Sequence, residues 1–433
     1  MRVTRALGKW IMPGIGLKRW IGLLLIGVAF TSIGLAFAIV EILTPQVLAG
    51  QPLPIALGSA IMLLISGLVV ILLSIIRLLR VVLAPYRRLQ NGSVIDVVYA
   101  HSKRHKGMRI VAIGGGTGLP AVLRGLKAHT SNLTAVVTVA DDGGSSGRLR
   151  RDLGVLPPGD LRNNIAALAD DESLMTRLFQ HRFDHGDLGG HAFGNLFISA
   201  LSGVTGSLET ALIETGRVLN IQGRVFPATL DDITLVATVR VNGEMQTVRG
   251  ESRITQTRGI IETITLAPAH AQAYAGSVEA IESADIVVVG PGSLFTSLLP
   301  NILVDGIREA LRATPALKIY VVNIATQPGE TENYNVADHI LTLERYIGRG
   351  VFQLILANNH YPTENAGVNT RYVQPAPEGH EILQRYTVHY HDLVDAERPW
   401  RHDPRKLANA ILSAADVIHK PVSHQTKVLH ASV

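Results

Sequence analysis

The sequence RIVAIGGGTG at residues 109–118 joins a short apolar run to a loop with four glycines in five positions. The apolar run is typical of a buried parallel strand, and residues 119–127 read as a helix that follows the loop. Because glycine has no Cβ, backbone N–H groups can approach a phosphate closely there, and the N-terminus of the helix adds a favourable partial charge. We therefore predict a phosphate-binding loop made of Gly114, Gly115, Gly116, Thr117 and Gly118.

This loop matches neither of two familiar nucleotide-binding patterns. A Walker A loop needs a Lys-Ser or Lys-Thr pair, which is missing from this loop, and Leu119 stands where the dinucleotide-binding pattern has its third glycine. A tight strand-to-helix turn without a ligand is the alternative interpretation.

Apolar runs of strand type alternate with helix-like stretches in the rest of this region. They cover residues 109–113, 134–140, 286–289, 319–323 and 352–357. This rhythm predicts an α/β fold with a Rossmann-like, mostly parallel sheet, in which ligands bind at the carboxyl ends of the strands. Residues 224–266 depart from the rhythm and alternate around the turn Asn242-Gly243, so we expect an antiparallel insertion there.

A second polar loop, DDGGSSGR at residues 141–148, follows the second predicted strand. Asp141 or Asp142 can accept hydrogen bonds from ribose hydroxyls or hold Mg²⁺, although the two side chains cannot both point the same way. Helix capping is the simpler interpretation, and GGSSG also fits a nucleophile elbow, which two aspartates separate from the strand. The residues expected to contact a ligand are Asp141, Asp142, Gly143, Gly144, Ser145, Ser146 and Arg148.

Four further clusters carry candidate site residues. They are PPGDLRNN at residues 157–164, GGHAFGN at 189–195, GPGS at 290–293 and TQPGET at 326–331. Each cluster alone has a composition that is common in turns or at helix starts, and helix capping alone would explain Asp160. The clusters therefore indicate a ligand site only when they are taken together. The predicted ligand contacts in these clusters are Asp160, Arg162, Asn163, Asn195, Gly290, Gly292, Ser293 and Gln327.

Histidines and acids in one region suggest a metal site at first sight. They are His181, Asp184, His185, Asp187 and His191. Their spacing matches no common zinc pattern, so we interpret them as loop residues and predict no metal ligands, and we treat His389 and His391 on one strand face in the same way. The chain has no cysteine, which excludes disulfides, thiol nucleophiles and cysteine-based metal sites.

The first hundred residues contain two uncharged apolar runs, residues 21–40 and 53–76. Each is long enough for a helix to cross a hydrocarbon core of about 30 Å. We predict a transmembrane hairpin with spans at 21–43 and 53–76. Lys and Arg flank its outer ends and are missing from the turn, so both termini and the main domain should face the cytoplasm from the inner (plasma) membrane.

The remaining segments are a basic N-terminus (1–20), a basic linker (77–107), a ligand-binding domain (108–420) and a tail (421–433). The linker could touch anionic head groups or be solvated. Because the basic residues crowd beside the apolar runs, the net charge of +5 indicates a membrane surface and no nucleic-acid partner. The alternatives to the hairpin are a signal peptide cleaved after Ala36-Phe37-Ala38 and a buried helical pair.

In this order the motifs resemble those of the YvcK-type gluconeogenesis-factor family, which is related to the CofD-type 2-phospho-lactate transferases. The match spans about residues 108–419 and rests on residues 114–118, 139–148, 157–163, 193–196, 231–232, 290–296 and 326–331. Asn164, Ala192, Ala228 and Ala325 depart from the residues usual in the family, and none of these changes removes a charge or a glycine.

The resemblance implies a Rossmann-like domain that binds a nucleotide or nucleotide-sugar, with a role in cell shape and envelope synthesis during gluconeogenic growth. By motif, residues 114–118 and 143–146 would hold phosphates, Asp141 or Asp142 the ribose or a metal, and Asn195 with residues 290–293 the rest of the ligand. Most relatives are expected to be soluble, which would make the hairpin an addition of this chain. Expected partners are the membrane, the ligand and envelope-synthesis proteins, and homo-oligomerisation is left open.

Two functions of different class fit these expectations. We favour a ligand-sensing regulator because no nucleophile or base stands out. The alternative is a transferase of a phosphorylated group from a nucleotide carrier, with Mg²⁺ on Asp141 or Asp142 and phosphates steadied by Arg148 and Arg162. An NAD-dependent dehydrogenase would need a conventional fingerprint and a catalytic acid or base, neither of which is evident.

Overall fold

The computed structural model describes residues 17–43, 54–87, 104, 106–169, 174–362 and 370–419. It divides into two compact units, Met1–His101 and Ser102–Val433. The start of the predicted basic N-terminus, the turn between the two spans, most of the basic linker and the predicted tail lie outside the described residues.

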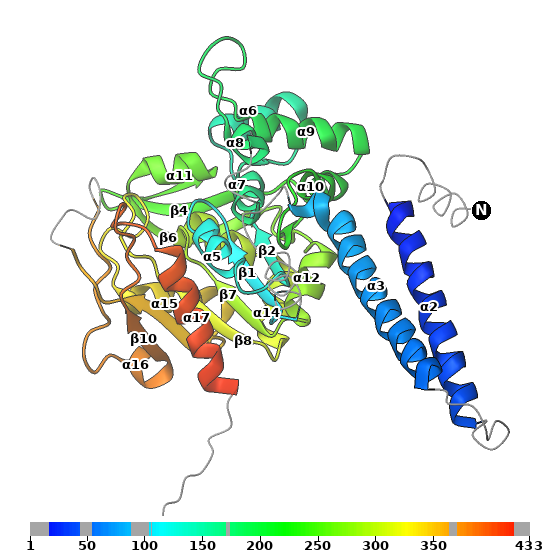
Figure 1. Ribbon diagram of the computed structural model, residues 1–433. Coiled ribbons are helices and arrows are strands. Elements are labelled where there is room, and N and C mark those ends of the chain that lie inside the picture. The colour runs from blue at the N-terminus through cyan, green and yellow to red at the C-terminus, as the bar shows by residue number, and fades with distance from the viewer. Residues whose placement is uncertain are drawn as a thin grey trace, which may run out of the picture. The chain divides into compact units, whose positions relative to one another are not determined.

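The first unit is a pair of long apolar helices, α2 (Leu17–Leu43) and α3 (Pro54–Arg87) (Figure 1). Their most apolar parts, Arg19–Val40 and Gly58–Leu79, are each 22 residues long with mean hydropathies of 2.5 and 2.8. Few of their side chains are buried, unlike those of a core helix in a soluble protein. By length and composition, both helices could therefore span a membrane.

Small residues hold α2 and α3 close together. A Cβ added to Gly34 would lie 2.9 Å from the Ala60 carbonyl oxygen, and one added to Gly67 would collide with the Thr31 side chain. At the other end of the pair, the Arg77 guanidinium lies 5.3 Å from the centre of the Trp20 ring. Backbone approach at small residues is a common way for apolar helices to associate without a hydrophobic driving force.

The second unit is built on a seven-stranded parallel sheet in the order β10-β9-β8-β7-β1-β2-β3. Its strands are β1 (Ile110–Gly114), β2 (Leu133–Val137), β3 (Arg224–Pro227), β7 (Ile286–Val289), β8 (Leu317–Val321), β9 (Leu354–Asn358) and β10 (Thr387–His391). The order runs outward from β1 in one direction and from β7 in the other. Such a reversal opens a crevice at the carboxyl ends of β1 and β7, where ligands bind in folds of this kind.

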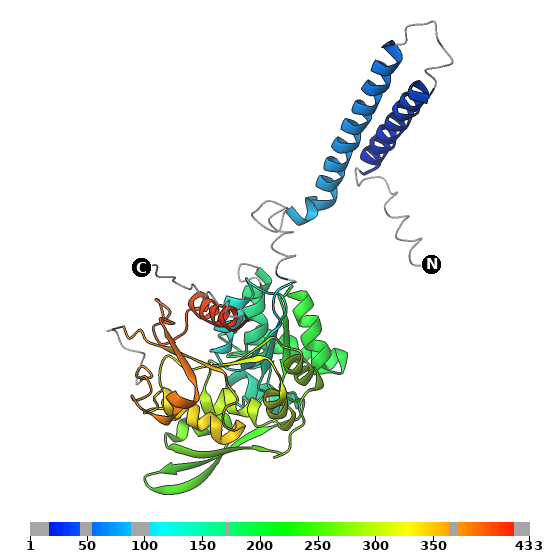
Figure 2. The same ribbon diagram turned by 90° about the horizontal axis from the view of Figure 1, so that it is seen from below.

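Helices cover both faces of this sheet (Figure 2). One layer contains α5 (Leu119–Leu126), α7 (Gly159–Leu168) and α17 (Pro404–His419), with α5 in contact with both other helices. The opposite layer contains α12 (Ala275–Glu282), α13 (Leu299–Ile302), α14 (Asp305–Ala313) and α15 (Val336–Ile347). All of these helices except α17 lie in connections between parallel strands, as crossovers between parallel strands require.

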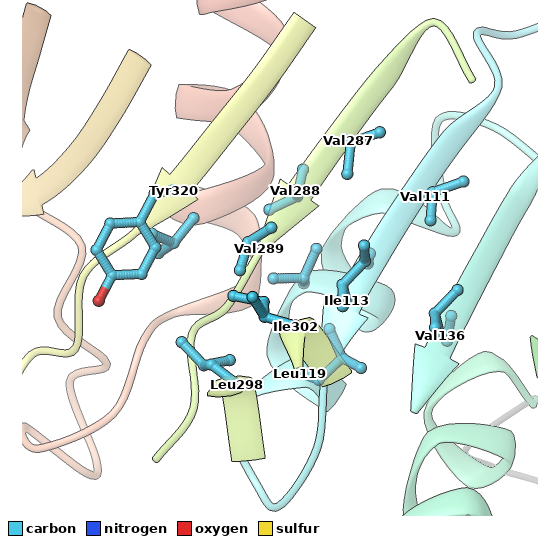
Figure 3. Close-up of a cluster of buried hydrophobic side chains, with 14 of the residues drawn as sticks. Val111, Ile113, Leu119, Val136, Val287, Val288, Val289, Leu298, Ile302 and Tyr320 are labelled. Carbon is cyan, nitrogen blue, oxygen red and sulfur yellow. The ribbon is translucent and has the colours of Figure 1, made fainter. Parts of the chain in front are cut away.

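The sheet core is buried from both sides, so its strands read as continuous apolar runs rather than alternating ones. Figure 3 shows this for β1 and β7, where Val111, Ile113, Val287, Val288 and Val289 pack between strands and helices. This rigid core places the loops that follow the strands.

The remaining elements are further helices and a small sheet. The helices are α6 (Gly144–Leu153), α8 (Leu174–Gln180), α9 (Phe193–Thr205), α10 (Leu208–Val218), α11 (Glu251–Thr257) and α16 (Glu381–Arg385), with a π-helical segment at Leu294–Leu298. The antiparallel sheet has the order β5-β4-β6, from β4 (Thr234–Val241), β5 (Glu244–Arg249) and β6 (Ile260–Ala267).

The predicted fold class, a Rossmann-like α/β domain with an antiparallel insertion after two apolar helices, is confirmed. The hairpin turn is also as predicted, since Asn242 and Gly243 both have positive φ angles, of 51° and 90°. The predicted start of the insertion at residue 224 is wrong, because Arg224–Pro227 is strand β3 of the parallel sheet. So short an edge strand carries too little apolar pattern to reveal its parallel partner.

Candidate functional site

A cavity of about 460 Å³ lies among the loops that follow β1, β7 and β8, on the carboxyl side of these strands. Five predicted site residues line it: Thr117, Gly118, Gly292, Ser293 and Gln327. Other parts of its wall come from α11 and from the segment between β10 and α17. The cavity is therefore where the strand order predicts a ligand site, with walls from distant parts of the chain.

The first loop (residues 114–118) packs directly on the loop of residues 290–293. A Cβ added to Gly118 would lie 2.7 Å from the Pro291 carbonyl carbon. Gly114 accepts a hydrogen bond on its carbonyl oxygen from the buried Asn301 amide, at 3.0 Å. The glycines thus allow two strand-end loops to touch, and this contact forms one edge of the cavity.

Asp160 occupies the space beside the first loop. Its Oδ2 accepts the Gly116 N–H at 2.7 Å, and a Cβ on Gly115 would come within 2.6 Å of the same oxygen. Burial, together with the charge of the nearby Asp141, raises the pKa of Asp160 to about 6. Asp160 therefore takes a backbone donor that the sequence pattern assigns to a phosphate, and it makes no side-chain cap for α7.

The cavity is also lined by two glutamates that the sequence did not predict as ligand contacts, Glu251 and Glu330. Burial raises the pKa of Glu251 well above its usual value, and the charges of Asp160, Asp141, Glu330 and Asp142 add to that shift. Glu330 accepts hydrogen bonds from the Thr296 hydroxyl at 3.0 Å and the Phe295 N–H at 3.3 Å. Burial raises its pKa to about 7.

These five carboxyl groups form an acidic cluster next to and within the cavity: Asp141, Asp142, Asp160, Glu251 and Glu330. In addition to burial, the negative charges of the other four raise the pKa of Glu251, and the charge of Asp141 raises the pKa of Asp160. Within the described ranges, no three His, Asp or Glu side chains come together as a group that could hold a metal ion.

A network of side-chain amides holds the loop of residues 290–293. The Asn323 side chain accepts the Gly292 N–H at 3.0 Å and donates to the Gly292 carbonyl at 2.9 Å. Gln327 donates through Nε2 to the Ser293 hydroxyl at 2.6 Å. The loop with Gly290 and Gly292 is thus held from the end of β8, which gives the cavity a preformed wall.

The two aspartates of the second loop (residues 141–148) point to different partners, as predicted. Asp141 accepts the Gly143 N–H and Asp142 the Ser252 N–H, both at 2.9 Å. A Cβ on Gly159 would meet the side chains of Ser146 and Asp141, so the second loop packs against the start of α7. Gly144 has a φ angle of 44°, a conformation that favours glycine.

Ser145 and Asn195 are buried and meet His191 behind the second loop. The Ser145 hydroxyl lies 3.1 Å from His191 Nδ1 and accepts a hydrogen bond from Asn195 Nδ2 at 3.0 Å. Burial and the nearby Arg148 lower the pKa of His191. The trio ties helices α6 and α9 together, and none of the three residues lines the cavity.

The predicted phosphate ligands Arg148 and Arg162 have other partners. Arg148 donates to the Gly189 carbonyl at 2.8 Å, and Arg162 donates to the Asn163 side chain at 2.6 Å. Neither arginine lines the cavity. Burial and the neighbouring Arg182 lower the pKa of Arg162.

Instead, three other arginines lie on the cavity wall: Arg124, Arg398 and Arg401. All three are exposed, and no carboxylate of the residues that the structure describes lies within ion-pair distance of them. Trp400 lies beside them and is 44% exposed. The sequence feature that could have indicated this part of the wall is RPWRH at residues 398–402, a basic and aromatic run before the predicted tail.

The comparisons with known proteins agree with this architecture. The family model described as 2-phospho-L-lactate transferase CofD matches residues 110–407. The gluconeogenesis factor of Bacillus subtilis is 41% identical over 316 residues, which cover 70% of this chain and 97% of that protein. A crystal structure of a UPF0052-family protein from Bacillus halodurans is 39% identical, has a TM-score of 0.67, and covers 71% of this chain and 99% of its own.

A relative from Nostoc extends further toward the N-terminus. It is 43% identical over 426 residues, covering 93% of this chain and 91% of its own length. An alignment that leaves out only 7% of this chain must include most of the first hundred residues. The expectation that the hairpin segment is an addition of this chain is therefore wrong, because some relatives share that segment while others, such as the one from Bacillus subtilis, do not.

Proposed function

This chain belongs to the CofD-like family that includes the gluconeogenesis factors, and from that premise we propose that it is a membrane-anchored regulator that binds a nucleotide or nucleotide-sugar. The ligand lies in the cavity between the first loop and the segment before α17. Ligand binding there changes how the protein acts on envelope-synthesis enzymes during gluconeogenic growth.

The polarity of the cavity is the observation that carries this proposal. One part of its wall has three exposed arginines without a carboxylate partner among the described residues, and another has Glu251 and Glu330. Unpaired guanidinium groups favour phosphate, because they donate several charge-assisted hydrogen bonds in a planar arrangement. Carboxyl groups accept hydrogen bonds from sugar hydroxyls.

The size of the cavity fits such a ligand. A volume of about 460 Å³ lies in the usual range for small-molecule sites. Thr117 and Gly118, at the end of the first loop, line the same space. Phosphates held between the arginines and this end of the first loop would avoid the Asp160 carboxylate, which already occupies the Gly116 N–H.

Two hydroxyl groups of the cavity wall already have hydrogen-bond partners, which favours a regulator over an enzyme. The Ser293 hydroxyl accepts from Gln327, and the Thr296 hydroxyl donates to Glu330. Neither is paired with a histidine or lysine that would activate it as a nucleophile. Binding without chemistry needs only the preformed polar wall.

The alternative is a transferase of a phosphorylated group from a nucleotide carrier, and the acidic cluster is the observation that favours it. Carboxyl groups with raised pKa values are typical of sites that move protons. Asp141 or Asp142 would supply oxygen ligands for Mg²⁺, which stabilises phosphoryl charge when bound. Phosphate oxygens of the ligand would have to complete its coordination, since the described side chains form no site for a metal by themselves.

Calorimetry with conversion analysis tests the proposal. Residues 102–433 are titrated with nucleoside diphosphates and nucleotide-sugars, with and without Mg²⁺, and each ligand is recovered and analysed. We expect a ligand that binds and is recovered unchanged. Arg398→Ala with Arg401→Ala should weaken binding about tenfold or more, because each change removes a charge-assisted contact.

Arg405→Ala is the matched control, because Arg405 is exposed on α17 and does not line the cavity. A Mg²⁺-dependent product that disappears in Asp142→Asn would establish the transferase instead. Failure of every nucleotide to bind would reject the proposal.

A further inference from the structure

Trp400 lies on the cavity wall without an aromatic or polar partner among the described residues. Its side chain is 44% exposed although it belongs to a well-packed domain. Among the described residues it makes no ring contact, no cation–π contact and no hydrogen bond through its indole N–H. Burying a tryptophan normally contributes strongly to stability, so an indole left exposed on a binding cavity points to a contact with the ligand.

Hydrogen bonds brace the loop that carries Trp400. Asp395 accepts the Glu397 and Arg398 N–H groups at 2.9 and 2.8 Å, and its own N–H donates to the Arg401 carbonyl at 3.0 Å. The buried His402 donates through Nε2 to the Val322 carbonyl at 3.1 Å, which ties the loop to the end of β8. The indole is therefore presented on a fixed base rather than on a mobile strand end.

We propose that Trp400 is the stacking platform for the nucleobase of the ligand. This inference rests on the proposed nucleotide site. With the base on the indole, the phosphates lie by the neighbouring Arg398 and Arg401, and the distal group of the ligand points toward Glu251 and Glu330. The ligand class is thus a nucleoside diphosphate that carries a hydroxyl-rich group.

We infer the orientation from the sequence order of three residues that line the cavity. Trp400 lies in sequence between the two arginines, so a base stacked on it brings its phosphates within reach of exposed cations. Aromatic stacking accepts any base, because every base has a π-face. We therefore expect binding to depend on the presence of a base more than on its identity.

The sequence offers a direct measurement. The chain has three tryptophans, Trp10, Trp20 and Trp400, so residues 102–433 contain Trp400 alone. That part of the chain folds without the first unit, since the Bacillus halodurans structure covers 71% of this chain and 99% of its own. Indole emission of this fragment then reports on one side chain.

The fragment is titrated with uridine, adenosine and guanosine diphosphates, and with pyrophosphate as a ligand without a base, by fluorescence and calorimetry in parallel. We expect the nucleotides to change the indole emission and pyrophosphate to leave it nearly unchanged. Trp400→Leu should weaken nucleotide binding about tenfold and pyrophosphate binding less than about twofold, whereas Trp400→Phe should retain most of the nucleotide affinity.

Nucleotide binding by calorimetry with unchanged indole emission, and with equal affinities in Trp400→Leu, would overturn the stacking role and leave the proposed function intact. An equal loss for nucleotides and pyrophosphate in Trp400→Leu would also overturn it, because a disturbed loop rather than a lost stack would then be the cause. Absence of nucleotide binding in the unaltered fragment would reject the proposed function itself.

Discussion

Gly118 lies where the first loop touches the loop of residues 290–293, and no side chain fits there. Gly118→Ala would place a Cβ against the Pro291 carbonyl, which is backbone and cannot swing away. We expect a loss of about 1–3 kcal/mol in the free energy of unfolding and weaker ligand binding, measured by urea denaturation and calorimetry.

Gly203→Ala is the control, because Gly203 lies in α9 with no atom within 4 Å of the added Cβ. It should leave binding unchanged and stabilise the domain by up to about 1 kcal/mol, since alanine favours helix. Equal effects of the two changes would contradict the tight contact.

Glu330 makes stability depend on pH. Its pKa is raised from 4.5 to about 7 by burial, so the folded protein holds this proton more tightly than the unfolded chain does. Unfolding therefore releases a proton between these pH values, and the free energy of unfolding falls as pH rises through this window. Glu330→Gln should reduce that fall by up to about 3 kcal/mol.

Urea denaturation of both proteins at several pH values across the window measures this effect. The remaining slope in Glu330→Gln would come from groups such as Asp160, whose pKa is also raised. Identical slopes with and without Glu330 would show that its carboxyl group is not held protonated.

At the level of single residues, the sequence predicted part of the candidate site. Thr117, Gly118, Gly292, Ser293 and Gln327 belong to loops that follow strands, and they line the cavity. The chemistry of their neighbours was not predictable, because burial and through-space charge decide what a side chain does. Arginine is a residue type that commonly binds phosphate, yet the structure gives Arg148 and Arg162 other partners.

At the level of elements, the N-terminal helix pair depends on small residues at the contact. Gly67→Leu would drive a side chain into Thr31 and should separate α2 from α3. Because the chain has no native cysteine, fluorescent labels on cysteines replacing Arg19 and Leu79 report the separation of the helices in detergent by energy transfer. We expect a longer label separation in Gly67→Leu than in the unaltered pair.

Gly58→Leu serves as the matched control, since nothing lies within 4 Å of a Cβ added there. It should leave the label separation unchanged. If α2 and α3 stay together in Gly67→Leu, the small residues at their contact do not hold the helices together.

At the level of the whole molecule, we propose a membrane protein with its ligand-binding domain in the cytoplasm. The absence of native cysteine also allows its topology to be measured with single cysteines and a membrane-impermeant maleimide. Gln51→Cys, in the predicted outer turn, should react in intact cells. Glu282→Cys, exposed in the second unit, should react only after lysis.

Reaction of Glu282→Cys in intact cells would reverse the proposed orientation. Release of the chain by a salt wash, without detergent, would show that the apolar helices do not span a membrane.

The sequence by itself determined the types of the elements and the loops between them. Continuous apolar runs predict buried strands and candidate spans, and glycine clusters predict strand-to-helix turns, because these patterns depend on neighbours along the chain. Such local rules were sufficient for the α/β class, the first loop and the two apolar helices.

Only the tertiary structure decided which loops share one cavity. The strand order places β1 beside β7, although 171 residues lie between the end of β1 at Gly114 and the start of β7 at Ile286. The cavity that the first loop lines is also lined by Glu251 from the insertion, Glu330 from the loop after β8 and Trp400 from the segment before α17. Their convergence, and the shifted protonation of the acids, arise from contacts between distant segments in a buried environment, which no local pattern encodes.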